Sequence, residues 1–173
     1  FINCRILGNQ DTIYTGAKFT RLYFKDCYID GTTDFIFGPS TALFENCMIH
    51  SKRNSYVTAA STPKEAKYGY IFKHCKLTAE PGVDKVYLGR PWRPYAYTLF
   101  IECELGKHIV PAGWHNWGKQ SNEETARYME YKNTGEGANV SERVAWSKQL
   151  TKKEAEAVTV DAIFRTQSDW NPI

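Results

Sequence analysis

Two aspartates, Asp11 and Asp34, each lie seven residues after a cysteine, Cys4 and Cys27 respectively. If these cysteines hold equivalent places in two successive structural repeats, the two carboxylates are stacked one above the other. Stacked carboxylates repel each other, so one retains its proton at a pH at which the other is ionised. Such a pair supplies a general acid and a nucleophile from a single residue type. The same aspartates could also serve only as turn formers, since Asp is common in turns.

The cysteines belong to a pattern that the chain repeats five times: Phe, two variable residues, Cys, one variable residue, then Ile or Leu. The copies are residues 1–6, 24–29, 44–49, 72–77 and 100–105. A further step from Cys103, as long as the step that leads to it from Cys75, lands on Tyr131, which we interpret as a degenerate sixth copy. Repetition at a period of roughly 20 to 30 residues is typical of a solenoid. The third copy has Asn54 at the place of the two aspartates, so the acidic row is expected to end with two members.

Each copy is a short apolar or aromatic segment bounded by Gly, Pro, Asn, Asp or Ser, which favours a β-strand. No copy has the roughly 10 to 12 residues of helical periodicity that a helical repeat needs. A parallel β-helix is therefore predicted, in which each coil buries its apolar face against its neighbours. Because Phe and Cys are three residues apart, we expect a bend or bulge between them that turns both inward. The cysteines are expected to form a stacked ladder of small buried side chains.

The composition is that of one domain covering residues 1–173, with 22 basic and 19 acidic side chains and no basic run. Nucleic acid is therefore not an expected partner, and no apolar run approaches the roughly 20 residues that span a membrane. We expect coils over about residues 1–133 and a C-terminal cap over about residues 134–173. Capping-box patterns begin at Ser121 and Thr151, and the second predicts a short helix near 152–158 that packs on the last coil.

Three blocks in the chain resemble the signature blocks of the pectin methylesterases, carbohydrate esterases of family 8 that demethylate pectin. They are Gly-Asn-Gln-Asp-Thr-Ile-Tyr at 8–14, Gly-Thr-Thr-Asp-Phe-Ile-Phe-Gly at 31–38 and Leu-Gly-Arg-Pro-Trp at 88–92. Residues 128–135 and 170–172 resemble closing segments of the same family. The resemblance covers nearly the whole chain. It implies an all-β fold, a right-handed parallel β-helix with a short helical and loop cap at its C-terminal end.

By position, the resemblance implies that Asp34 is the nucleophile that attacks the methyl ester of galacturonate. Asp11 would be the general acid that protonates the departing methanol and then the base that activates water. Gln10 would stabilise the oxyanion of the tetrahedral intermediate with its side-chain amide, and Arg90 would orient Asp34. The resemblance thus implies a carboxylic ester hydrolase that leaves pectate and methanol.

Trp92, Tyr14 and Phe37 resemble the residues that bind the sugar rings of the substrate. The resemblance implies pectin as the partner, with no cofactor and no metal, and we expect a monomer. Because pectin is extracellular, a secreted or periplasmic location is inferred from the function and not from a targeting signal. The chain opens inside a repeat, so N-terminal coils are expected to be missing before Phe1, together with a second oxyanion Gln of the family. Whether this piece is active by itself is left open.

Taken singly, these residues allow plainer interpretations. Arg90 could be a solvated loop cation, Trp92 a packing residue, and Tyr14 and Phe37 part of the aromatic packing of the coils. The fold also admits another β-helical polysaccharide enzyme, either a pectate lyase or a polygalacturonase, since paired carboxylates suit glycoside hydrolysis too. A non-catalytic β-helix that binds polysaccharide is a third interpretation.

The four histidines follow no ligand spacing and no catalytic-triad spacing. We expect His74 to be exposed and His115 to be a loop residue. A Ser-His-Asp esterase would need a Gly-x-Ser-x-Gly elbow around its nucleophile, and the chain has no such motif.

Overall fold

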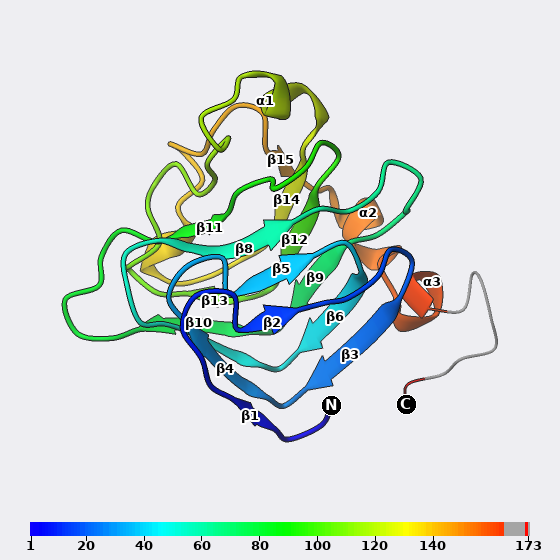
Figure 1. The fold of residues 1–173 in the computed structure, drawn as a ribbon. Coiled ribbons are helices and arrows are strands. Elements are labelled where there is room, and N and C mark those ends of the chain that lie inside the picture. The colour runs from blue at the N-terminus through cyan, green and yellow to red at the C-terminus, as the bar shows by residue number, and fades with distance from the viewer. Residues whose placement is uncertain (165–171, 173) are drawn as a thin grey trace.

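A computed structural model describes residues 1–164 and 172, in which short parallel strands are wound into stacked coils (Figure 1). Sheet 1 consists of β1 (Arg5–Ile6), β4 (Tyr28–Gly31), β7 (Met48–Ser51), β10 (Lys76–Ala79) and β13 (Glu104–Leu105). Sheet 2 consists of β2 (Ile13–Tyr14), β5 (Ile36–Gly38), β8 (Tyr56–Ala60) and β11 (Tyr87–Gly89). Sheet 3 consists of β3 (Arg21–Lys25), β6 (Thr41–Glu45), β9 (Tyr70–Lys73), β12 (Tyr97–Ile101), β14 (Arg127–Tyr131) and β15 (Lys148–Gln149). The predicted parallel β-helix is confirmed.

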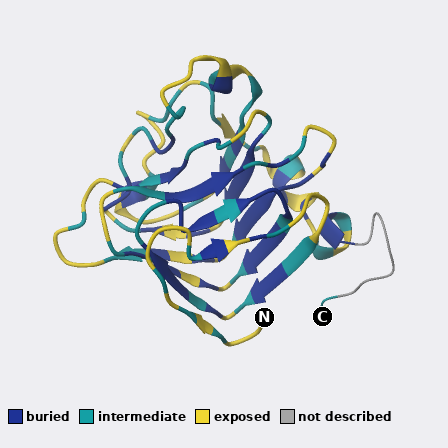
Figure 2. Ribbon diagram, viewed as in Figure 1, coloured by how far each residue is buried: buried dark blue, intermediate teal, exposed yellow. Residues whose placement is uncertain are grey.

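A row of stacked phenylalanines runs from coil to coil, and all of its members except the exposed Phe1 lie in the core. Phe1, Phe24, Phe44, Phe72 and Phe100 stack face to face, with successive ring centroids 4.8, 4.7, 4.5 and 4.4 Å apart. These separations are close to the spacing of roughly 4.8 Å that hydrogen bonding imposes on neighbouring strands. The hydrogen bonding between strands therefore sets the distance between successive rings. Buried positions follow the strands, whereas most of the connecting loops are exposed (Figure 2).

A residue in the left-handed backbone region precedes every cysteine and forms the predicted bend. The residues and their φ angles are Asn3 (52°), Asp26 (53°), Asn46 (53°), His74 (54°) and Glu102 (50°). This bend turns both Phe24 and Cys27 into the core, where each is 2% exposed. His74 is exposed, as expected.

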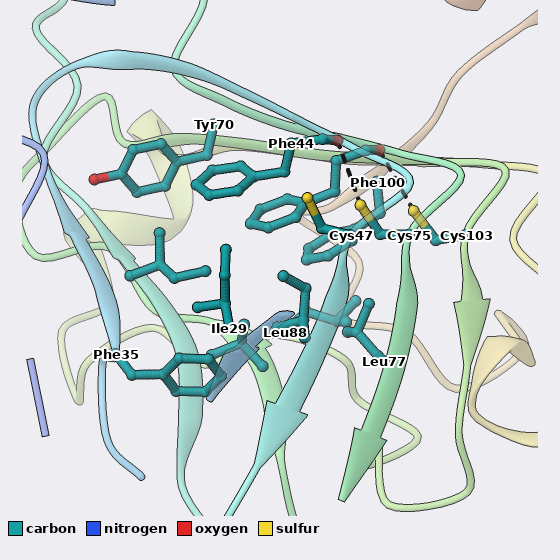
Figure 3. Packing of buried hydrophobic residues seen from close by; sticks show 14 of the residues in the cluster. Ile29, Phe35, Phe44, Cys47, Tyr70, Cys75, Leu77, Leu88, Phe100 and Cys103 are labelled. Carbon is teal, nitrogen blue, oxygen red and sulfur yellow. Dashed lines mark hydrogen bonds between the residues drawn. The ribbon is translucent and has the colours of Figure 1, made fainter. Parts of the chain in front are cut away.

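The predicted cysteine ladder is also present, and all five cysteines are free. Cys47, Cys75 and Cys103 each direct Sγ at a phenylalanine carbonyl of the preceding coil, at 3.6, 3.3 and 3.4 Å respectively. Figure 3 shows these three side chains side by side along the phenylalanine stack. Cys4, in the first coil, is only partly buried. The ladder fills the core and leaves chemistry to other residues.

The sixth coil follows a register that differs from the predicted one. Phe100 pairs with Glu130, because the connection into β14 is two residues longer than in the previous repeat. The counterpart of Cys103 is therefore Asn133, whose Oδ1 accepts a hydrogen bond from the Cys103 backbone N–H at 3.0 Å. The assignment of Tyr131 was wrong. Glu130 ends the phenylalanine row as a buried carboxylate, and Arg143 Nε lies 2.9 Å from its Oε1.

The C-terminal segment contains the predicted helix as α2 (Lys152–Glu156), followed by α3 (Val160–Phe164). Thr151 and Glu154 form both hydrogen bonds of a capping box, which confirms that pattern. Buried side chains of both helices join a second apolar cluster on the outer face of sheet 3, together with Tyr23, Leu43, Ile71, Leu99 and Ile101. The cap thus lies along the side of several coils and shares this cluster with Tyr131 of the sixth coil (Figure 1).

The other capping-box pattern is not formed. Ser121 is the first residue of α1 (Ser121–Thr125), and the N-cap position is held by Gln120 without a side-chain cap bond. A short 3-10 helix spans Glu136–Ala138. No helix in residues 1–164 is long and apolar enough to cross a membrane. Of the closing segment noted at 170–172, residues 170 and 171 lie outside the described part of the chain.

Phe72→Ala removes a fully buried ring from the middle of the stack, between Phe44 and Phe100. We expect the free energy of unfolding to fall by about 3–5 kcal/mol, because the lost burial adds to the cost of a cavity. Urea denaturation followed by circular dichroism measures this. The control is Lys76→Ala in the same coil, whose exposed ion pair with Glu104 is worth less than about 1 kcal/mol. A loss at Phe72 as small as that of the control would contradict a core set by the stack.

Candidate active site

The two aspartates lie at equivalent places just before β2 and β5. From the first coil to the second, paired residues are separated by the same number of positions along the chain in sheet 1 as in sheet 2. The connection between these sheets therefore has the same length in both coils. Asp11 consequently lies beside Asp34, and its backbone N–H donates to the Thr33 carbonyl at 3.1 Å. Both aspartates have left-handed φ angles, 57° and 49°, which Asp adopts more readily than most residues.

Asn54 is not the next member of this row. From the second coil to the third, paired residues are further apart along the chain in sheet 2 than in sheet 1. The reason is that the third coil has two extra residues in its connection from sheet 1 to sheet 2. They bring Tyr56 next to Asp34, and the Tyr56 carbonyl accepts the Asp34 backbone N–H at 2.9 Å. The Asn54 side chain instead accepts the backbone N–H of Asp84 at 2.9 Å. The predicted place of Asn54 was wrong, although Asp11 and Asp34 do lie in adjacent coils without a third aspartate beside them.

Arg90 reaches Asp34 because β11 approaches β8 closely. A Cβ on Gly89 would lie 2.1 Å from Thr58 Oγ1, so only glycine allows this approach. The Arg90 guanidinium then binds both carboxylate oxygens of Asp34, with Nε 3.0 Å from Oδ1 and Nη2 2.7 Å from Oδ2. Bidentate contacts of this kind fix orientation as well as charge. Asp34 is only 7% exposed, so its ion pair is largely shielded from water.

Two aromatic rings hold the guanidinium from both faces. Arg90 Cζ lies 3.9 Å from the ring centroid of Tyr56 and 3.7 Å from that of Trp117. A guanidinium stacked between rings keeps its N–H edge free for the carboxylate. The sequence patterns did not indicate either ring. Tyr56 lies beside Asp34 only because of the two-residue insertion, which counting by the repeat does not reveal. Trp117 lies in a loop that the repeat does not cover.

The two carboxylates have different surroundings. Asp34 faces the Arg90 cation, whereas Asp11 is exposed and has no ion pair to any residue of the described chain. Partial desolvation, and after it the negative charge of Asp34, raise the pKa of Asp11 above its ordinary value. Asp11 therefore keeps a proton to higher pH than an isolated aspartate, which suits a general acid beside an ionised neighbour.

Six of the seven predicted site residues line one cleft of about 250 Å³: Gln10, Asp11, Asp34, Phe37, Arg90 and Trp92. Ala59 and Trp117 complete its wall. Tyr14 lies outside this cleft but packs against Phe37 with its ring tilted, and the ring centroids are 5.0 Å apart. Together with Trp92, Tyr14 lines an adjoining cleft of about 580 Å³. Trp92 is therefore shared by the walls of both clefts.

The family model for pectinesterases matches residues 1–167. The chain belongs to the pectinesterase family. It is 44% identical to pectinesterase 31 of Arabidopsis thaliana over 90% of this chain and 49% of that protein. It is 40% identical to the putative pectinesterase 11 of the same plant, over 98% of this chain and 47% of that protein.

Solved structures of pectin methylesterases have the same fold. The enzyme from carrot superposes with a TM-score of 0.87 at 34% identity, covering 94% of this chain and 55% of the carrot chain. The enzyme from Yersinia enterocolitica gives a TM-score of 0.78 at 31% identity, with 96% and 59% covered. This chain thus spans about half the length of the curated relatives that it matches.

Asp34→Asn removes the negative charge that faces Asp11. We expect the pKa of Asp11 to move down toward its ordinary value, yet to stay above it, because desolvation is the larger cause of the shift. A pH titration of the side-chain carboxyl carbons by NMR measures this change. Asp84→Asn, at an exposed loop position, serves as the control and leaves the Asp11 titration where it was. An unchanged Asp11 pKa in Asp34→Asn would show that the two carboxylates are not coupled.

Proposed function

We propose that this protein hydrolyses the methyl esters of galacturonate in pectin, releasing methanol and leaving pectate. The observation that carries the proposal is the pair of aspartates in adjacent coils, of which only Asp34 is clamped by a cation. Membership in the pectinesterase family supports the same substrate class. A solved pectin methylesterase in complex with a hexasaccharide superposes on this chain with a TM-score of 0.82 at 30% identity, which supports an oligosaccharide chain as the ligand.

In the first half of the proposed reaction, an oxygen of Asp34 attacks the ester carbonyl carbon. Arg90 occupies one lone-pair direction on each carboxylate oxygen, which leaves others free for attack. The tetrahedral intermediate carries its negative charge on the former carbonyl oxygen, where the Gln10 amide donates a hydrogen bond. When this intermediate collapses, the bond to the methoxy group breaks. Asp11 gives its proton to that group, so methanol leaves and an acyl-enzyme on Asp34 remains.

The second half reverses these roles. Asp11, now ionised, takes a proton from water as the water oxygen attacks the acyl carbon. A second tetrahedral intermediate forms and collapses, which releases galacturonic acid and returns Asp34 to the carboxylate state. The acid then gives its proton to the solvent and becomes galacturonate. Asp11 is again protonated, so both residues regain their starting forms. The raised pKa of Asp11 favours the protonated state at the beginning of the cycle.

The adjoining cleft offers room for neighbouring sugar units of the same polysaccharide. Trp92 belongs to the lining of both clefts. Lys18 and Arg93 line the adjoining cleft, and among the described residues its lining contains no acidic side chain. A cationic lining of this kind is complementary to an anionic polymer such as partly demethylated pectin. We further propose that the protein acts outside the cytoplasm, secreted or periplasmic, as a monomer.

Incubation with highly methylated pectin tests the reaction class. We expect methanol without new reducing ends or unsaturated products, because the attack falls on the ester and leaves the glycosidic bond intact. Reducing ends would point to a polygalacturonase, double bonds that absorb ultraviolet light to a lyase, and the absence of any product to a non-catalytic β-helix.

Substitutions of the site test the individual roles. Asp34→Ala or Asp11→Ala should abolish methanol release, and Gln10→Ala should lower kcat by about 10² to 10³, the cost of losing one oxyanion donor. Methanol release is measured alongside cooperative thermal unfolding, which shows that each variant is folded. The control is again Asp84→Asn, which should keep full activity. Near-normal turnover of either aspartate variant would overturn the assigned roles.

A further inference from the structure

The loop at residues 115–118 lies directly against the backbone that carries Arg90. Trp114 forms a β-bridge with Gly89, and the His115 backbone N–H donates to the Gly89 carbonyl at 3.1 Å. The side chain of His115 packs on two tyrosines, with ring centroids 5.4 Å from Tyr56 and 5.3 Å from Tyr87. His115 is therefore the predicted loop residue, but it is half-buried beside the ion pair of the candidate site.

The His115 ring also holds the backbone of Trp117. Its Nδ1 accepts the Trp117 backbone N–H at 3.0 Å, so this nitrogen carries no proton. Trp117 has a φ of 63°, in the left-handed region that a large side chain adopts only when its surroundings hold it there. One such support is the His115 acceptor, and a second is Asn116, whose Oδ1 accepts the Gly118 N–H at 2.8 Å.

The conformation of Trp117 in turn places the indole on Arg90. The guanidinium carbon lies 3.7 Å from the indole centroid, on the face opposite Tyr56. Loss of this ring would leave one face of the guanidinium open and free it to rotate away from Asp34. A line of contacts thus runs from His115 through Trp117 and Arg90 to the carboxylate, and no step in the proposed reaction uses His115 itself.

We propose that His115 is a positioning residue, whose neutral imidazole keeps Trp117 stacked on Arg90 and whose protonation releases this support as the pH falls. The proposal rests on the proposed esterase function for its catalytic consequence. Protonated His115 would carry a hydrogen on Nδ1, which would face the Trp117 N–H donor to donor and end the hydrogen bond. The imidazolium would also add a positive charge beside Arg90.

The groups around His115 favour its neutral form at neutral pH. The charged or titratable side chains that face it are Arg90 just after β11, Tyr87 within β11 and Tyr56 of β8, with Asp34 beyond Arg90. Burial, and after it the Arg90 charge, lower the pKa of His115 from its ordinary value. The imidazole therefore stays neutral until the pH falls through this lowered pKa, and support for Trp117 is lost only below it.

Two substitutions separate the acceptor from the ring. His115→Asn keeps an acceptor, because an Asn side chain commonly accepts the N–H two residues on, and it does not titrate. His115→Phe keeps an aromatic ring on Tyr56 and Tyr87 but has no acceptor. We expect His115→Phe to lower kcat for methanol release roughly 3- to 10-fold, the size of one net hydrogen bond. His115→Asn should stay within roughly 2-fold of the unsubstituted protein at neutral pH, since its hydrogen bond is retained.

The pH profile of kcat gives the sharper comparison. The unsubstituted protein should lose activity at a higher pH on the acid side than His115→Asn, whose acceptor persists. Identical acid limbs in the two proteins, or equal kcat values for the Asn and Phe variants, would overturn the proposal, since a ring that only packs makes no such distinction. Thermal unfolding of each variant shows that the comparison is made between folded proteins.

An NMR measurement tests the positioning step without catalysis. The backbone amide of Trp117, observed by ¹⁵N correlation spectra, should shift with pH in the unsubstituted protein and stay constant in His115→Asn over the same range. Suppose that neither the unsubstituted protein nor the His115 variants release methanol, while the Trp117 amide still shifts with the protonation of His115. That result would overturn the proposed esterase function and leave the positioning role of His115 in place. If the amide does not respond to the titration, the proposed coupling of His115 to Trp117 is wrong.

Discussion

The candidate site depends on one geometric constraint, the constant rise of about 4.8 Å that parallel hydrogen bonding imposes between coils. This rise stacks the core phenylalanines and holds the cysteines in line. It brings two carboxylates together only because the first two coils have connections of equal length between sheets 1 and 2. Repulsion between Asp11 and Asp34 is thus built into the backbone and cannot relax by movement of one strand. Because the Arg90 cation binds Asp34 and not Asp11, the repulsion acts on two carboxylates that are no longer equivalent.

Arg90 comes from a different coil, and its position depends on contacts that are remote in sequence. Gly89 allows β11 to lie close to β8, and Tyr56 and Trp117 confine the guanidinium between their rings. The insertion that displaced Asn54 from the acidic row is the same one that puts Tyr56 beside Asp34. A change in coil length that ends the row of aspartates therefore also supplies a wall for the cation.

The parallel β-helix, the inward bend and the adjacency of the two aspartates could be predicted, because all three follow from a repeat that is visible in the sequence. The places of Asn54 and Tyr131 could not, since each follows a connection lengthened by two residues, and register beyond an insertion is set by pairing and not by counting. The helix after Thr151 was predictable because its capping box is local. Trp117 and His115 lie in a loop with no repeat, so the contact of Trp117 with Arg90 and that of His115 with Trp117 appear only in three dimensions.

The left-handed residue before each cysteine has a consequence for how such a chain can vary. Its identity changes along the stack from Asn3 and Asp26 to His74 and Glu102, while its φ stays between 50° and 54°. The corner is thus a fixed point of every coil, whatever side chain it exposes. Growth of the coils is confined to the other connections, where the repeats differ in length. The outward-facing side chains at these corners form a line on the surface. Their charges can differ from one coil to the next, as the facing pair His74 and Glu102 illustrates, without disturbing either the core or the carboxylates.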